Sequence, residues 1–189
     1  KHAIGGALRY FSLGEITFTD ASGNVLRDDK PSEFELTGAY AFKLSDKFSI
    51  GVNGKFAYSN LTGGLTVAGV MTKAGKVGAA DLSFAYYNDR VKLGNKNATY
   101  MFATTINNIG NKVAYSVLAK RDFIPMNLKI GNALQIKYDS YNTITYSVDI
   151  QRLLVPTPAF YDKIDGETVM LSGRSGDVGV INGMLQSFY

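Results

Sequence analysis

Side chains that commonly carry chemistry are scarce in this sequence. The 189 residues include no cysteine and one histidine, His2. Without cysteine there can be no disulfide, no thiolate metal ligand and no thiol nucleophile. A single imidazole at position 2 argues against a Ser/His/Asp triad and against a histidine-based metal site. The residue types therefore predict a protein that is not an enzyme and that binds no metal.

Three short segments imitate known motifs, but each departs from the required pattern. Gly69 to Val77 resembles a phosphate-binding loop, yet Val77 stands where Ser or Thr would bind Mg²⁺. Asp20 to Asn24 resembles the start of a calcium loop, yet Pro31 occupies the position of the bidentate Glu. Gly173 to Gly176 lacks the Gly-x-Ser-x-Gly spacing of a nucleophile elbow. We expect turns or loops at all three, and no cofactor.

The composition favours strands over helices. The chain contains 20 Gly, 12 Tyr and 11 Phe, a mixture typical of strands joined by tight turns. With 46% hydrophobic and 19% charged residues, it is predicted to form one ordered domain over residues 1–189. The net charge is +4, but the basic residues never form a run of three, so no nucleic-acid partner is expected.

Hydrophobic alternation predicts two long hairpins. Apolar and small or polar residues alternate over 34–44 and 48–58, and again over 126–139 and 143–151. Weaker patterns predict three more strands, which cover 3–19 with a bend at Gly14, 80–87, and 99–108. The expected fold is therefore all-β, with seven antiparallel strands.

The length of these strands points to a membrane. Eleven residues at about 3.3 Å each, tilted by about 40°, nearly span the hydrocarbon core of a bilayer, whereas strands of soluble domains usually have about 5 to 6 residues. A soluble lipocalin-like barrel remains the alternative, because alternation alone does not say which face is inside. No transmembrane helix is expected, since the longest apolar stretch, Leu61 to Thr72, contains several glycines. No signal peptide is expected, since no apolar h-region follows Lys1.

If the strands form a membrane barrel, the apolar face is expected to point to lipid and the polar face to the lumen. The residues predicted to face lipid are Phe42, Ile50, Phe56, Leu134, Ile136, Tyr146 and Val148. The residues predicted to line the lumen are Glu35, Lys43, Asn53, Lys55, Lys129, Gln135, Lys137 and Asp149. Charges of this second set could line a permeation route or a ligand cavity, or they could pair across the lumen as a plug.

The connections between strands predict two different rims. The turns at 45–47 and 139–142 are short and would share one rim, as periplasmic turns do. Long connections at 20–33, 59–79, 109–125 and 155–189 would share the other rim. Residues 88–98 are expected to form a longer loop on the short-turn side, against this pattern.

Several short segments occur in a distinctive order along nearly the whole chain. They are Leu8 to Gly14, Ile16, Thr19-Asp20, Gly23-Asn24, Leu44 to Gly51, Ile106 to Tyr115, and Gln186 to Tyr189. Their order and spacing resemble the PorV (LptO) family, outer-membrane barrels of the Bacteroidota type IX secretion system that are related to the FadL fatty-acid transporters. The resemblance implies a barrel of about fourteen strands, of which this chain would form only part, and no catalytic residue.

The resemblance also implies a function in protein transport at the outer membrane of a Gram-negative bacterium. The expected role is a carrier that binds the C-terminal signal domains of secreted cargo and passes them from the translocon to the cell-surface sortase complex. Outer-membrane lipids are expected to surround the barrel. The alternative is a FadL-like transporter of hydrophobic small molecules. Apolar residues in the long connections are predicted either to bind a partner or to cap the barrel; they are Leu61, Leu65, Met71, Val180, Met184, Leu185, Phe188 and Tyr189.

Overall fold

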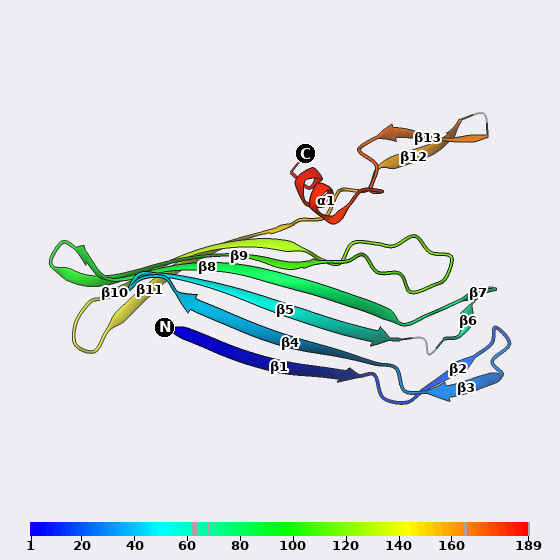
Figure 1. The fold of residues 1–189 in the computed structure, drawn as a ribbon, viewed down its shortest axis with the longest axis horizontal. Helices are drawn as coiled ribbons and strands as arrows, with labels where there is room; N and C mark the ends of the chain where they lie inside the picture. Colours follow the sequence, from blue (N-terminus) through cyan, green and yellow to red (C-terminus); the bar gives the residue numbers. More distant parts are fainter. Residues whose placement is uncertain (62–63, 68, 165, 189) are drawn as a thin grey trace.

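The computed structural model is built almost entirely from antiparallel strands (Figure 1). It describes residues 1–61, 64–67, 69–164 and 166–188. The long strands are β1 (His2–Ser12), β4 (Ser32–Lys43), β5 (Phe48–Asn60), β8 (Gly75–Leu93), β9 (Lys96–Gly110), β10 (Asn127–Lys137) and β11 (Thr143–Leu153). The short elements are β2 (Ile16–Thr19), β3 (Val25–Asp29), β6 (Thr66–Val67), β7 (Val70–Met71), β12 (Phe160–Ile164), β13 (Glu167–Ser172) and the helix α1 (Val180–Gln186).

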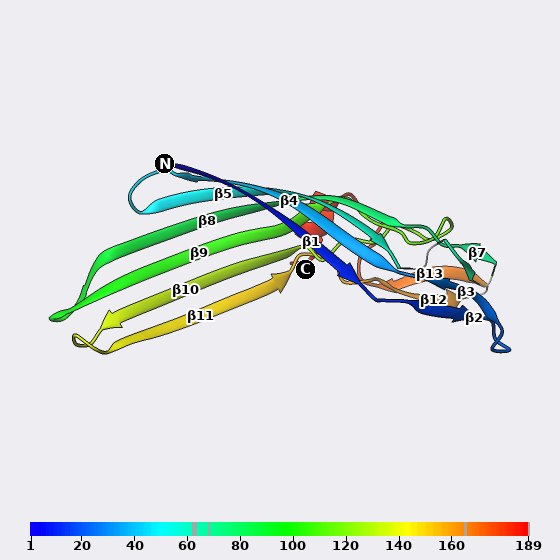
Figure 2. The same ribbon diagram turned by 90° about the horizontal axis from the view of Figure 1, so that it is seen from below.

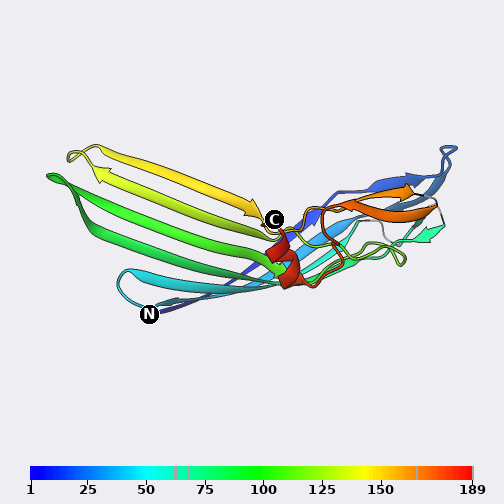
Figure 3. The ribbon, with the colours of Figure 1, turned by 90° about the horizontal axis from the view of Figure 1, so that it is seen from above.

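The seven long strands form one sheet in the order β1-β4-β5-β8-β9-β10-β11. Every neighbouring pair is antiparallel, so the predicted seven-stranded all-β fold is confirmed. The sheet is twisted and curved but not closed (Figures 2 and 3). Within the described residues, β1 pairs only with β4 and β11 only with β10. Two edges with unpaired backbone groups are costly in lipid, so the sheet fits part of a barrel wall.

The two ends of the sheet differ as the sequence predicts. One end carries the short connections between β4 and β5, between β8 and β9, and between β10 and β11. The other end carries the β2–β3, β6–β7 and β12–β13 hairpins (Figure 1). At the short-turn end Asp139 closes its turn by accepting hydrogen bonds from the backbone N–H groups of Tyr141 and Asn142, at 2.8 and 2.7 Å. The Asn142 side-chain amide, followed by these N–H groups, lowers the pKa of Asp139.

Two details of the predicted strands are wrong. Residues 88–98 are not a loop, because β8 and β9 continue through them and meet at the two-residue connection 94–95. The cross-strand pairing of β8 with β9 satisfies the backbone there despite several charged side chains. The strand predicted over 3–19 does not bend at Gly14 but ends at Ser12. Gly14 has φ +78°, and Ile16–Thr19 pairs instead with β3 in a separate hairpin.

The two faces of the sheet are unequally exposed in its first half. Along β4 and β5 the apolar side chains face outward to the surface, with Leu36 57% and Phe56 44% exposed. The alternating polar positions, including Glu35, Asn53 and Lys55, are half-buried. This is the reverse of a soluble barrel, in which the apolar side is covered. Of the residues predicted to face lipid, Ile50, Phe56, Tyr146 and Val148 are exposed, whereas Phe42, Leu134 and Ile136 are partly covered by neighbours.

The small apolar core lies at the long-loop end. Ile124, Met126 and Leu154 are buried there, between the ends of the strands and α1. Val180 and Met184 of α1 pack against this cluster. None of the described helices is both long and apolar enough to cross a membrane.

Candidate functional site

A charged cluster occupies the half-buried face of the sheet, centred on Asp81. Asp81 is 5% exposed and lies on β8 directly opposite Asn53 of β5. The Lys55 ammonium lies 2.7 Å from one carboxylate oxygen, Asp81 Oδ2, and the Asn53 amide donates to the same oxygen at 3.0 Å. Asn53 and Lys55 are two residues apart on one strand, so both side chains point to the same face. The cluster therefore follows directly from strand register.

The other oxygen of Asp81 is bound by a bulge in β9. Ala80 pairs with Ile109 and Leu82 with Ile106, so Asp81 faces two residues instead of one. The second of these, Asn108, has φ 60° and donates its backbone N–H to Asp81 Oδ1 at 2.8 Å. Its side-chain oxygen accepts from Lys55 at 3.1 Å. The carboxylate thus satisfies the backbone group that the bulge removes from the ladder.

Asn108 has a left-handed backbone, which a residue with a Cβ adopts only at a cost in stability. Glycine adopts positive φ without strain, whereas alanine does not. We expect Asn108→Ala to be less stable than Asn108→Gly by about 1 to 2 kcal/mol. Both variants lose the same side-chain amide, so their difference isolates the backbone term. Urea unfolding of both proteins in vesicles measures it, and equal stabilities would contradict the bulge geometry.

The charged cluster opens on a shallow concavity. Its volume is about 400 Å³, and it is lined by Ala7, Arg9, Glu35, Thr37, Asn53, Lys55, Asp81 and Asn108. Three predicted lumen residues, Glu35, Asn53 and Lys55, are therefore brought together. Lys55 pairs with Asp81 rather than with Glu35 or Asp149. Arg9 and Glu35 lie opposite each other on β1 and β4, so the polar face continues to the sheet edge.

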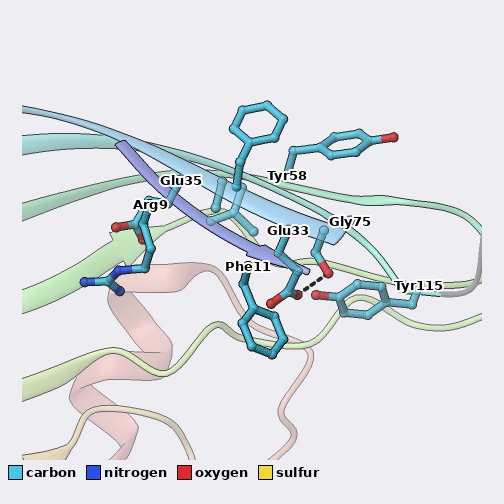
Figure 4. A pocket seen from close by; sticks show the side chains of 11 residues that line it. Arg9, Phe11, Glu33, Glu35, Tyr58, Gly75 and Tyr115 are labelled. Atoms are coloured by element: carbon cyan, nitrogen blue, oxygen red, sulfur yellow. Dashed lines mark hydrogen bonds between the residues drawn. The ribbon is translucent and has the colours of Figure 1, made fainter. Parts of the chain in front are cut away.

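A second concavity adjoins the first toward the long-loop end (Figure 4). Its volume is about 230 Å³. It shares Arg9 and Glu35 with the first and adds the rings of Phe11 and Tyr115. Glu33 accepts a hydrogen bond from Ser59 inside it, at 2.5 Å. We call this second concavity the aromatic mouth. Its aromatic rings and its carboxylates suit a bound group that is amphipathic or cationic.

Gly75 allows Tyr115 to pack closely against the end of β8 in the aromatic mouth. A Cβ there would lie 2.8 Å from the Tyr115 ring and 2.9 Å from Val113. Any side chain would push the 111–126 connection away from the sheet, because both contacts are shorter than real Cβ contacts. The glycine thus lets this connection pack closely over the end of β8.

The remaining predicted lumen residues lie elsewhere. Gln135 and Lys137 line a separate concavity of about 530 Å³ at the short-turn end. Lys43 is exposed and lies 3.7 Å from Asp46 of the adjoining turn. Lys129 is exposed on β10, and the Asp149 carboxylate lies against Gly131 of the neighbouring strand. Among the described residues, no ion pair joins Lys129, Lys137 or Asp149 to another side chain, so the structure shows no charge-paired plug through them.

Sequence reasoning missed Asp81 and Asn108. Asp81 breaks an apolar run, Ala79-Ala80-Asp81-Leu82, within a predicted strand, and such a carboxylate needs a partner. Asn107-Asn108 interrupts another strand, and Asn is the side chain that best tolerates a left-handed backbone after Gly. Both signals were present in the sequence.

Among the described residues, there is no group of three or more His, Cys, Asp or Glu that could hold a metal ion.

The predicted partner-binding residues are not brought together. The β6–β7 segment projects beyond the sheet, well away from α1 (Figures 1 and 3). Leu61 and Met71 are exposed, and Leu65 is half-buried. Leu185 on α1 and Phe188 in the turn after the helix are exposed, whereas Val180 and Met184 of α1 pack on the core. Tyr189 lies outside the described residues.

These features define a class of protein. Long antiparallel strands, an exposed apolar face, a half-buried polar face and two unequal rims are the architecture of a transmembrane β-barrel wall. The model of one family, described as type IX secretion system protein PorV, matches residues 1–160. The chain belongs to this family and is a component of the type IX secretion system, so the resemblance noted from the sequence is confirmed. A search of curated proteins found no match.

Proposed function

We propose that this chain forms part of an outer-membrane barrel that acts as a non-enzymatic carrier in type IX secretion. In this role it binds the C-terminal signal domains of secreted cargo and passes them from the translocon to the cell-surface sortase complex. The observation that carries the proposal is the family match over residues 1–160. The charged cluster supports it, because a wall with a buried Lys55–Asp81 pair is unlike a continuous apolar channel.

We place the cargo contact on the exposed β6–β7 side of the long-loop rim. Leu61 is 36% and Met71 is 56% exposed there, and the buried core of a protein interface is more apolar than the rest of the surface. Thr72 of the same segment bonds back to the Leu65 carbonyl at 2.7 Å, which holds the hairpin in place. A surface that is ordered before binding loses less entropy when a partner binds.

The test is cargo capture by a double variant, Leu61→Ser with Met71→Ser. We expect normal barrel assembly and at least about a tenfold loss of cargo co-purification, as two interface anchors are removed. Leu93→Ser is the matched control, because Leu93 is 48% exposed on the opposite rim. Unchanged capture by the double variant, or equal loss in the control, would count against this surface.

A lipid transporter is the second candidate, favoured by one observation. The aromatic mouth lined by Phe11 and Tyr115 provides apolar walls beside charged groups, as an amphiphile requires. Deletion of the gene separates the two functions. Loss of many surface proteins from cells and medium supports secretion, whereas loss of growth on one lipid substrate alone supports transport.

A further inference from the structure

The helix α1 lies over the apolar face of the sheet, not over its polar face. Arg152 pairs with Leu128, Leu128 with Ile106, and Ile106 with Leu82, so these four side chains share one face. Leu82, 50% exposed, belongs to the apolar side. The Arg152 guanidinium donates to the Ser187 carbonyl and lies 4.7 Å from the centroid of the Phe188 ring. The end of α1 is therefore held against the outward face near the long-loop rim.

One side of α1 is fixed to the protein. Val180 and Met184 pack on the buried cluster. A Cβ at Gly183 would come within 2.5 Å of the Phe123 ring and 3.3 Å of Pro156, so the backbone of the helix touches these two side chains. These residues recur at helical spacing and define the packed side.

The other side of α1 is apolar and uncovered. Ile181, Leu185 and Phe188 recur at i, i+4 and i+7 and are 61%, 59% and 52% exposed. The helix sequence Val180 to Gln186 contains no charged residue. A charge-free surface of this kind is unfavourable in water, but it continues the apolar band formed on β11 by Tyr146, Val148 and Ile150.

We propose that α1 is an interfacial membrane helix and that its Ile181 and Leu185 side chains, with Phe188 of the turn that follows it, contact the acyl chains of the outer leaflet. Arg152 marks the edge of the apolar band, where an arginine keeps its charged end near the headgroups. Its bond to the Ser187 carbonyl and its contact with Phe188 anchor the helix at that level. Leu185 and Phe188, predicted above as partner-binding residues, are thereby assigned to lipid. The inference rests on the membrane orientation of the proposed function.

The experiment uses a single tryptophan as a reporter, because the chain contains none. Phe188→Trp, Val148→Trp and Ser147→Trp are each reconstituted in phosphatidylcholine vesicles with and without dibrominated acyl chains. Val148 and Ser147 are adjacent on β11 and point to opposite faces. We expect Phe188→Trp to lose fluorescence with brominated lipid as strongly as Val148→Trp, while Ser147→Trp is unaffected.

The quenching results distinguish a failure of the membrane helix from a failure of the barrel orientation, in which the apolar face of the sheet points to lipid. Quenching at Val148→Trp but not at Phe188→Trp overturns the membrane helix and leaves the barrel orientation standing. No quenching at Val148→Trp overturns the orientation itself. Ile181→Trp, on the same exposed side of α1, gives a second reading if Phe188→Trp disturbs the Arg152 contact.

Discussion

Asp81→Ala is expected to lower the free energy of unfolding by about 3 to 5 kcal/mol, the usual cost of leaving one member of a buried ion pair alone. The side chains of Lys55 and Asp81 are only 19% and 6% exposed, so contact with solvent offsets little of the ion pair that the ammonium loses. The bulge N–H of Asn108 also loses its acceptor. Urea unfolding of the protein in vesicles measures the change.

The double variant Lys55→Met with Asp81→Asn provides the control. It removes both charges but keeps a side-chain oxygen that can accept from the Asn108 N–H. Because neutral replacement of a buried pair is often tolerated, we expect this variant to recover most of the lost stability. A double variant as unstable as Asp81→Ala would show that packing, and not the unpaired charge, causes the loss.

The alternation of residue types was sufficient to predict the long hairpins. In β4 and β5 successive side chains point alternately to the apolar and the polar face of the sheet. The alternation of residue types over Phe34 to Lys43 and Phe48 to Tyr58 therefore predicts which residues lie on each face. Both turns, near Asp46 and Asp139, were placed correctly for the same reason. Strand pairing then follows from short connections between neighbours.

Where the sequence misled, strands extended beyond the alternating segment. Asp89, Arg90 and Lys92 suggested a loop, but β8 continues through all three, with Asp89 and Arg90 in a bulge between Asn88 and Val91. Pairing with β9 supports the backbone regardless of side-chain polarity. Strand ends that project from the apolar band need not alternate, which is why periodicity alone placed this boundary wrongly.

The sequence signals Asp81 and Asn108 individually, but the contacts within the charged cluster could not be predicted from it, for a different physical reason. Asn53 and Asp81 are 28 residues apart in the chain, and only the exact register of β5 and β8 places them side by side. Asn108 contributes through a bulge and a positive φ, neither of which periodicity can locate. The polar face was predicted correctly as a face, but its internal partners depend on these local irregularities.

The largest test of orientation is Val148→Arg, at the centre of β11. Val148 is 45% exposed on the apolar face, and its neighbour Ser147 lies on the other face. An arginine that faces lipid at the bilayer midplane costs about 2 to 4 kcal/mol in a transmembrane barrel. We expect Val148→Arg to lose that amount of stability in vesicle unfolding measurements.

Ser147→Arg is the matched control, since it adds the same charge one residue away. On the polar side the guanidinium meets water and the Ala133 position of β10, to which Ser147 is paired. Its cost is expected to be much smaller than that of Val148→Arg, because a hydrated charge avoids the transfer into hydrocarbon. The reverse order, with Ser147→Arg the more damaging variant, would place the apolar face inside and make the protein a soluble-type barrel. Equal losses would show that neither side chain faces lipid.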